Sequence, residues 1–565
     1  MRRDEHISSG WERAREATGM STWVDVTTYG DLVVRGAALH GDQDAVVFPD
    51  TRHSFNSLEA AARRSARSLL GLGVRPQDRV GILMPNCMDF IEVMFGVALI
   101  GAVPVPINAR FKGRELAYVT ENADLKVLVT SDIIDQFTDY VVILHDCLPG
   151  LADAPDPANL DLDVAPELKA VVLLGSTSPA GMVDRAGFEA LAENATDDEV
   201  ELLRSQVAIR NEALMIYTSG TTAEPKGCPL NHESLVRTAV TACRTRFELT
   251  DNDVFWDPLP LFHMSSILPL IGCLDAGSSY VTITHFDPAE AIAQMRDEKA
   301  TVCFSTFPPV TQAMINHPDW DSDEFQRIRL MNNVAPPDAL RAIHALLPWA
   351  RHVNAYGLTE CGGVVSFSGP DDPPETWAVS SGRPFRGIEV KIKDLETREA
   401  LTEPNQPGEI WVRGYNVFEG YYKDPEKNAE CFDDEGWFFT GDIGSLDPEG
   451  RISYLGRTKD MLKVGGENVA AVEIESYLQT HPAVAIAQVV PLPDEKYQEI
   501  PAAFVELKPD AEATEEELIE FCRDQIASFK IPRHVQFVAP NEWPMSATKI
   551  QKFRLADKLQ AELGL

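Results

Sequence analysis

Short apolar runs alternate with amphipathic helical stretches through the first two thirds of this chain. The runs, each about the length of one buried strand, are residues 80–84, 103–107, 170–174, 280–283 and 302–304. Strands that alternate with helices are joined by right-handed crossovers, so this order predicts parallel sheets with helices on their faces. At 565 residues the chain is also too long for one ordinary core, and several packing units are expected.

The local pattern changes toward the C-terminus. From Gly408 onward, GEIWVRG and GRISYLGR are typical of shorter strands joined by Gly and Asp turns, which indicates a small β-rich region. The last hundred residues combine a Glu-rich helix from Ala513 with a strand at 534–538 and predict a further α/β unit. Near the other end, Asn56-Ser-Leu-Glu59 predicts a capping box that opens a helix running to about Leu70.

Composition excludes several classes of protein. Asp plus Glu total 87 against 50 Lys plus Arg, and the net charge of -37 argues against nucleic acid or an anionic membrane as the main partner. The nine cysteines include no CxxC pair, which indicates reduced thiols in a cytoplasmic protein. The N-terminus lacks the apolar core of a signal peptide, and the most apolar stretch, residues 93–107, is too short to span a bilayer. The oligomeric state stays open, with a homodimer among the options.

One loop has the composition of a phosphate-binding element. Residues 217–227 read YTSGTTAEPKG, between an apolar run and a helix expected near Asn231. Such a loop offers backbone N–H groups, hydroxyl donors and one cation, which suit a polyphosphate. It is not a Walker loop, because Pro225 and Gly227 flank Lys226 where that motif needs Gly and Ser or Thr. On spacing alone, an ordinary surface loop explains the pattern equally well.

Two later segments carry groups suited to a nucleotide. Thr440-Gly-Asp442 supplies a carboxylate, whose oxygens can accept from both hydroxyls of a ribose. Gly456-Arg457 follows an expected strand and supplies a fixed fork of donors for the same sugar. Each segment standing alone is more often a simple glycine turn.

The order of these segments resembles the acyl-adenylate-forming superfamily of acyl-CoA synthetases, luciferase-like enzymes and peptide-synthetase adenylation domains. Residues 218–227 match its phosphate loop except for Ala223 in place of Gly, and residues 259–263, 354–360 and 544–552 resemble its other elements. The resemblance implies a large N-terminal domain of layered α/β sheets with a distorted β-barrel subdomain, residues 1–458. A hinge at Lys459 and a small mobile α+β C-terminal domain, residues 460–565, would follow.

The activity implied is that of an AMP-forming acyl-CoA synthetase, a ligase of fatty acid metabolism. ATP and a small-molecule carboxylic acid would give acyl-AMP and pyrophosphate, and coenzyme A would then give acyl-CoA and AMP. Mg²⁺ would accompany the ATP. Three alternatives remain open from the residues: loading of the acyl group onto a carrier protein, a non-catalytic nucleotide-binding regulator, and luciferase-like oxygenation.

The resemblance also implies roles for individual residues. Lys549, Glu360 and Lys226 would be catalytic, with Lys549 stabilising the transition state at the α-phosphorus, while Thr222 and Glu360 would hold Mg²⁺. The nucleotide would contact Thr218, Ser219, Gly220, Thr221, Thr222, Lys226, Ala335, Tyr356, Gly357, Thr359, Asp442, Arg457 and Lys549. The hinge and the CoA passage would use Lys459, Lys463, Gly465, Gly466 and Asn468. The acid pocket would involve His263, Asn333, Val334 and Ala355.

Departures from the family pattern concentrate at the acid pocket and near Lys549. Asn333 and Val334 stand where relatives usually have small residues, and Ala355 replaces a frequent Gly. Extra side chains there should shorten or reshape the tunnel, which argues against an unbranched very long fatty acid. The Gly usually found before the catalytic lysine is missing, so Thr548 directly precedes Lys549.

Overall fold

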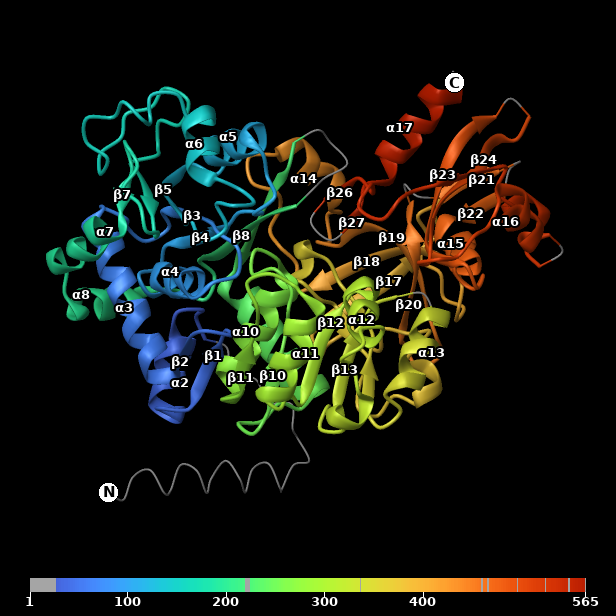
Figure 1. Ribbon diagram of the computed structural model, residues 1–565, viewed down its shortest axis with the longest axis horizontal. Helices are drawn as coiled ribbons and strands as arrows, with labels where there is room; N and C mark the ends of the chain where they lie inside the picture. Colours follow the sequence, from blue (N-terminus) through green and yellow to red (C-terminus); the bar gives the residue numbers. More distant parts are fainter. Residues whose placement is uncertain are drawn as a thin grey trace.

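The computed structural model describes residues 27–218, 224–335, 337–458, 461–464, 467–494, 496–523, 525–546 and 549–563. Figure 1 shows helices and strands in layers, with the C-terminal elements α15 to α17 gathered at one end of the molecule. The predicted alternation of strands and helices is confirmed through the N-terminal part of the chain.

The first sheet is parallel and five-stranded, in the order β4-β3-β5-β6-β7. Its strands are β3 (Arg79–Leu83), β4 (Val103–Pro106), β5 (Leu125–Thr130), β6 (Ala170–Leu173) and β7 (Val183–Asp184). The helices of this part are α3 (Phe55–Gly71), α4 (Met88–Leu99), α5 (Gly113–Asn122), α6 (Tyr140–Cys147), α7 (Arg185–Leu191) and α8 (Asp197–Gln206). Every residue of β4 and β6 is buried, as continuous apolar runs predict for strands covered on both faces.

The second sheet has seven strands in the order β14-β13-β12-β10-β11-β1-β2, and only β2 runs antiparallel to its neighbour. Its strands are β1 (Asp44–Val47), β2 (Arg52–Ser54), β10 (Val254–Trp256), β11 (Ser279–Val281), β12 (Val302–Thr306), β13 (Leu330–Asn333) and β14 (Arg351–Val353). Its helices are α2 (Asp31–His40), α10 (Met264–Ala276), α11 (Pro288–Asp297), α12 (Pro308–Ile315) and α13 (Pro337–Leu346). The first described strand, β1, thus pairs with β11, far along the chain.

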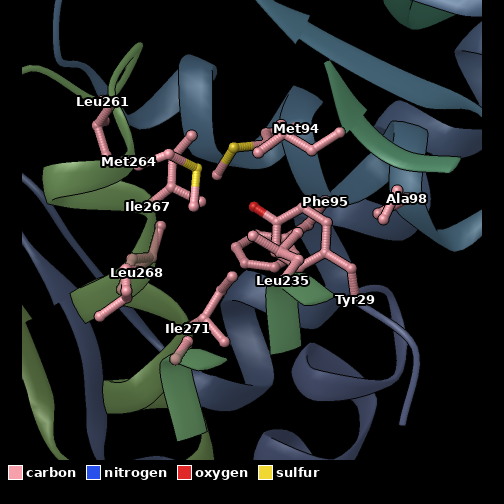
Figure 2. Packing of buried hydrophobic residues seen from close by; sticks show 14 of the residues in the cluster. Tyr29, Met94, Phe95, Ala98, Leu235, Leu261, Met264, Ile267, Leu268 and Ile271 are labelled. Atoms are coloured by element: carbon pink, nitrogen blue, oxygen red, sulfur yellow. The ribbon is translucent and has the colours of Figure 1, made fainter. Parts of the chain in front are cut away.

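Helices from distant parts of the chain share one apolar core. Figure 2 shows Met94 and Phe95 of α4 beside Met264, Ile267 and Ile271 of α10. Each fully buried side chain of this size stabilises the fold by about 1.5–3 kcal/mol. The segment before α10 in the chain consists of α9 (Thr238–Ala242) between two π-helical turns, η2 (Glu233–Arg237) and η3 (Cys243–Phe247). This core fixes the start of α10, which bears on the site described below.

The predicted β-rich region is a four-stranded antiparallel sheet. Its strands are β17 (Ile388–Lys393), β18 (Gly408–Gly414), β19 (Phe438–Leu446) and β20 (Ile452–Arg457). Two separate two-stranded ladders are β8 (Glu212–Thr218) with β9 (Lys226–Asn231) and β15 (Ala355–Tyr356) with β16 (Ser366–Phe367), and α14 (Pro425–Cys431) lies between β18 and β19 in the sequence. In the strand order, β17 and β20 are the two ends of this sheet. Backbone hydrogen bonds continue beyond them, from β17 to Leu401 and from β20 to Ser381 and Gly382.

The C-terminal part is the expected small α+β unit. Its sheet consists of β21 (Met461–Val464), β22 (Glu467–Ala470), β23 (Val484–Asp494), β24 (Gln498–Leu507) and β25 (His534–Phe537). The remaining elements are α15 (Ala471–Gln479), α16 (Glu515–Cys522), the two-stranded ladder of β26 (Met545–Ser546) and β27 (Lys549–Ile550), and α17 (Lys552–Leu563). Helix α15 contacts α13 and β20 of the large part of the chain.

The predicted capping box at Asn56 is wrong by two residues. Helix α3 begins at Phe55, and its N-cap is Ser54, whose hydroxyl accepts a hydrogen bond from the Ser57 amide. Asn56 instead donates from its side chain to Asp42. Serine is about as favourable as asparagine at an N-cap, so the preference for these residue types does not favour Asn56 over Ser54.

The cysteines are free thiols, and the most apolar stretch of the chain is part of the folded core. None of the nine cysteines forms a disulfide, and all except Cys147 are buried. Residues 93–107 divide between α4 and β4. In the described part of the chain, no helix has both the length and the apolar character needed to cross a membrane.

Candidate active site

The expected phosphate loop connects β8 and β9, two strands that pair with each other. Thr218, the last residue of β8, pairs directly with Lys226, the first residue of β9. Five further cross-strand pairs continue this ladder back to Glu212 and Asn231. The two ends of the loop are therefore held side by side. Its predicted ligands Ser219, Gly220, Thr221 and Thr222 lie outside the described residues, as does Ala223.

Lys226 contacts Tyr421 and Asp424, which lie in a segment much later in the chain. Its Nζ lies 3.3 Å from Asp424 Oδ2 and 5.3 Å from the centre of the Tyr421 ring. Only 14% of the Lys226 side chain is exposed, so its charge points into the protein rather than into bulk water. The Tyr421 hydroxyl donates to Glu360 Oε1 at 2.8 Å. Tyr421 therefore brings together the two predicted catalytic groups Lys226 and Glu360.

The segment that carries Glu360 is held by a close backbone approach. Gly357 lies between β15 and the 3-10 turn η5 (Thr359–Cys361), which contains Thr359 and Glu360. A Cβ at Gly357 would lie 2.3 Å from the Gly363 carbonyl oxygen and 2.4 Å from the Val364 Cα. Only glycine allows this approach, which explains its presence in the expected nucleotide segment.

Three predicted nucleotide contacts meet around one buried carboxylate, that of Asp442. The Tyr356 hydroxyl donates to Asp442 Oδ2 at 3.0 Å, and Arg457 Nε lies 3.1 Å from Asp442 Oδ1. The β19–β20 register places Asp442 directly opposite Arg457. The Asp442 side chain is only 3% exposed, whereas that of Arg457 is 36% exposed. Burial next to this carboxylate raises the pKa of Tyr356, so its hydroxyl stays protonated as a donor.

His263 is the N-cap residue of α10. It ends the loop that follows β10, and Asn86 holds this loop through two hydrogen bonds. The Asn86 side chain donates from Nδ2 to the Leu259 carbonyl at 2.8 Å and accepts at Oδ1 from the Leu261 amide at 2.7 Å. The Leu259 amide in turn donates to Asp257 Oδ1 at 2.9 Å. Asn86 follows a strand of the first sheet, so its buried side chain links that sheet to the loop after β10 of the second sheet.

The contribution of Asp257 to the stability of the folded chain depends on pH. The carboxyl is fully buried, and burial raises its pKa to about 8, although bonds from the Leu259 amide and the Tyr280 hydroxyl favour the charged form. An unfolded chain loses this proton near pH ~3.9. Between these two values the folded chain holds one more proton than the unfolded chain, so this group lowers stability as pH rises through the window.

The Asp257→Asn variant should therefore lose less stability than the wild type between pH 5 and pH 8. An asparagine keeps the acceptor for Leu259 and has no proton to lose. Urea midpoints of both proteins across this range provide the measurement, and all other titrating groups cancel in the difference. Parallel pH profiles for the two proteins would contradict the assignment.

The carboxyl ends of β12 and β13 form a polar network next to the expected acid pocket. Asn333 is 2% exposed, and its Oδ1 accepts from the Thr311 hydroxyl at 2.6 Å. Thr306 has a φ of 52°, a strained value for a β-branched residue, and donates to Asn332 Oδ1 at 2.8 Å. Val334, by contrast, is 37% exposed. Ala335 and Ala355 are half-buried beside these strands.

Several C-terminal candidates are only partly described. Lys463 is exposed on β21, and its amide donates to Glu499 Oε2 at 2.6 Å. Its backbone pairs with that of Asn468, and Val464 pairs with Glu467, so residues 465 and 466 connect two paired strands. Lys459, Gly465 and Gly466 lie outside the described residues, as do the side chains of Asn468 and Lys549. The Lys549 backbone pairs with that of Ser546.

Sequence reasoning missed Tyr421, Asp424 and Asn86. Tyr421 and Asp424 belong to the sequence GYYKDP, in which nothing but the aromatic pair stands out. Asn86 follows an apolar strand in MPNC, where it reads as an ordinary turn residue. Their contacts depend on the meeting of segments far apart in the chain, so local patterns could not identify them.

The residues present fit a magnesium ion bound together with a nucleotide. Among the described residues, no cluster of three or more His, Cys, Asp or Glu side chains could hold a metal by itself. Mg²⁺ commonly binds through one or two protein oxygens while phosphates and water complete its shell. Glu360 supplies a half-buried carboxylate whose Oε1 is oriented by Tyr421.

Two family models match this chain. The model of the AMP-binding enzyme matches residues 33–422, and the model of the AMP-binding enzyme C-terminal domain matches residues 473–549. Asp442 and Arg457 lie between the two matched ranges, where the structure brings them together.

Relatives cover almost the whole chain. The mitochondrial medium-chain acyl-CoA ligase ACSF2 of Rattus norvegicus is 32% identical over 571 residues, which cover 95% of this chain and 88% of that protein. A (methyl-dioxo-octahydroindenyl)propanoyl:CoA ligase of Rhodococcus jostii is 32% identical over 518 residues, or 91% of this chain and 95% of that protein.

A solved structure agrees with these sequence matches. The anthranilate CoA ligase AuaEII in complex with anthranoyl-AMP has a TM-score of 0.83 at 25% identity and covers 96% of this chain and 99% of its own. Transfer to CoA is thereby supported over loading of a carrier protein. The chain belongs to the AMP-binding enzyme family and is an AMP-forming acid–CoA ligase that uses ATP.

Proposed function

We propose that the candidate site binds ATP through two sets of residues, one for the phosphates and one for the adenosine. Lys226, Tyr421 and Glu360 would face the phosphates, while Tyr356, Asp442 and Arg457 would bind the adenosine. The observation that carries this proposal is their connection: one short segment supplies Tyr356 to the second group and Glu360 to the first.

In the first step, a carboxylate oxygen of the acid attacks the α-phosphorus of ATP. The bond from that phosphorus to the bridging oxygen breaks, and pyrophosphate leaves with the electron pair. Lys226 would share the charge of the leaving group, and Lys549 would stabilise the charge that develops between the two reacting anions. Glu360 and Thr222 would hold Mg²⁺, whose chemistry there would be to neutralise part of the triphosphate charge.

In the second step, the CoA thiol gives its proton to solvent and the sulfur attacks the acyl carbon. The bond from that carbon to the phosphate oxygen breaks, and AMP leaves with the electron pair as the phosphate anion. This step needs a different surface of the C-terminal domain, with residues 460–565 turning about Lys459. Lys463, Asn468 and the Gly465-Gly466 pair would then line the passage of the pantetheine arm, since glycine leaves room for a close approach.

The hinge can be tested by a backbone restriction. The Lys459→Pro variant should form acyl-adenylate normally but transfer the acyl group to CoA at least ~10-fold more slowly, because proline fixes φ and restricts the residue before it. Both half-reactions would be measured separately, with Lys459→Ala as the matched control that keeps backbone freedom. Unimpaired transfer in the proline variant would remove the hinge assignment.

We further propose a medium-length or ring-containing acid as the substrate. Asn333 and Val334 add side chains at the end of β13, where a long straight chain would need space. The Rattus norvegicus relative is named for medium-chain acids and the Rhodococcus jostii relative for a ring-bearing propanoyl group. Hydroxamate trapping and pyrophosphate release with aliphatic, aromatic and polycyclic acids, with and without CoA, would test this. Fastest turnover of acids above sixteen carbons would contradict it.

We also propose that the enzyme acts in the cytoplasm. Nine cysteines without a disulfide suit a reducing compartment. Fractionation of cells that produce the full chain, with immunodetection, would test this location.

A further inference from the structure

A partly buried ion pair lies three residues beyond Lys549. Lys552, the first residue of α17, places its Nζ 2.5 Å from Glu475 Oε1. The two side chains are 21% and 7% exposed, so water screens this pair only weakly. Separating Lys552 from Glu475 would leave a charge uncompensated in a partly buried place, which is energetically costly. The pair therefore favours keeping the start of α17 next to α15.

Glu475 also binds a third element. The same Oε1 accepts a hydrogen bond from the Val489 amide at 2.7 Å. Val489 belongs to β23, and Glu475 belongs to α15. One carboxylate therefore joins α15, strand β23 of the C-terminal sheet, and the start of α17.

Helix α15 lies at the contact between the two parts of the chain. It contacts α13 and β20, and a Cβ built at Gly456 of β20 would lie 3.7 Å from Val472 Cγ1 of α15. Gly456 directly precedes Arg457, which binds Asp442 in the candidate site. The helix that holds Lys552 through Glu475 is thus the helix that lies against the strand carrying Arg457.

Lys549 belongs to a short two-stranded ladder. Met545 pairs with Ile550 and Ser546 with Lys549, and the Gln551 amide donates to the Pro544 carbonyl at 2.7 Å. Ile550 packs against the apolar cluster formed by Val490, Leu492, Ala502, Phe504, Trp543, Leu555 and Leu559. Lys552 is the charged anchor at the end of this short ladder.

We propose that the Glu475–Lys552 ion pair is a positioning device for Lys549. It ties the loop that carries Lys549 to α15, so that contact of α15 with α13 and β20 sets where Lys549 stands relative to the nucleotide. This inference rests on the adenylation role proposed for Lys549. Both members belong to the C-terminal unit, so the pair moves with that unit as it turns and serves the first half-reaction alone.

The test compares variants that preserve shape. Glu475→Gln keeps an acceptor for Val489 while it removes the charge, and Lys552→Met keeps most of the aliphatic stem. Each should slow acyl-adenylate formation about 10-fold, equivalent to about 1.4 kcal/mol in the barrier, and leave thioester formation from a supplied acyl-adenylate unchanged. Lys552→Arg should restore most of the rate. Glu473→Gln is the matched control, because Glu473 lies on the same helix in a more exposed pair with Lys530.

The measurements use the full chain with octanoate, or with whichever acid of the panel releases pyrophosphate fastest, and its synthetic acyl-adenylate. Equal loss in both half-reactions together with a lower melting temperature would show a merely structural role, and unchanged adenylation would also overturn the proposal. In a Lys549→Ala background, Lys552→Met should have no further effect on adenylation. If Lys549→Ala itself leaves adenylation intact, the proposed role of Lys549 fails; if it impairs adenylation and Lys552→Met does not, only the positioning proposal fails.

Discussion

The Lys549→Ala variant is expected to form acyl-adenylate at least ~100-fold more slowly than the wild-type enzyme, because removal of one preorganised donor from a transition state costs about this much. Attack of a carboxylate on a triphosphate brings two anions together, and a lysine between them lowers the barrier most when the new bond is forming. Thioester formation from a supplied acyl-adenylate has no such pair of anions and should proceed almost unchanged.

Two assays separate these outcomes. Pyrophosphate release in the absence of CoA measures the first half-reaction, and acyl-CoA formation from synthetic acyl-adenylate measures the second. Lys558→Ala is a suitable control, because Lys558 lies on α17 with 62% of its side chain exposed. Comparable losses in both half-reactions of Lys549→Ala would mean that Lys549 does not have the proposed role.

The second large effect concerns ATP binding. The Asp442→Ala variant should raise the KM for ATP by about 10- to 100-fold, since hydrogen bonds to a charged group contribute roughly 1.5–3 kcal/mol. The substitution removes the acceptor proposed for the ribose and also deprives Tyr356 and Arg457 of a shared partner. The KM for the acid should change much less.

Steady-state kinetics with ATP and the acid varied in turn would measure both constants. Asp434→Ala, at an exposed position of the turn before β19, is the matched control. Asp442→Asn should fall between the wild type and the alanine variant, because an amide keeps one acceptor oxygen without its charge. If ATP and acid constants rise together in Asp442→Ala, a general loss of structure is the better explanation.

Much of the fold follows from local patterns. Continuous apolar runs such as those of β4 and β6 favour buried parallel strands, and the structure confirms these two. The order of strands within the sheets could not be predicted, because the pairing of β1 with β11 depends on tertiary packing. The start of α3 was misplaced for a related reason, since Ser54 and Asn56 are both good N-caps.

The candidate site divides in the same way. Lys226, Glu360, Asp442 and Arg457 were identified from the sequence because their segments resemble known ones, but their mutual contacts were not. The register of β19 and β20 places Asp442 opposite Arg457, and the position of Tyr421 joins Lys226 to Glu360. Neither fact has a local signature. Contacts between residues far apart in the chain depend on the tertiary fold, so sequence motifs alone could not predict them.

The hairpin of β8 and β9 has a consequence for protein engineering. Because six cross-strand pairs hold its strands together and Thr218 lies opposite Lys226, the span that the intervening loop must bridge is set by the ladder and not by the loop's own sequence. Residues 219–223 could therefore be exchanged for the corresponding residues of another ligase without a change in the ladder that flanks them. Grafted loops would then report on phosphate recognition separately from folding.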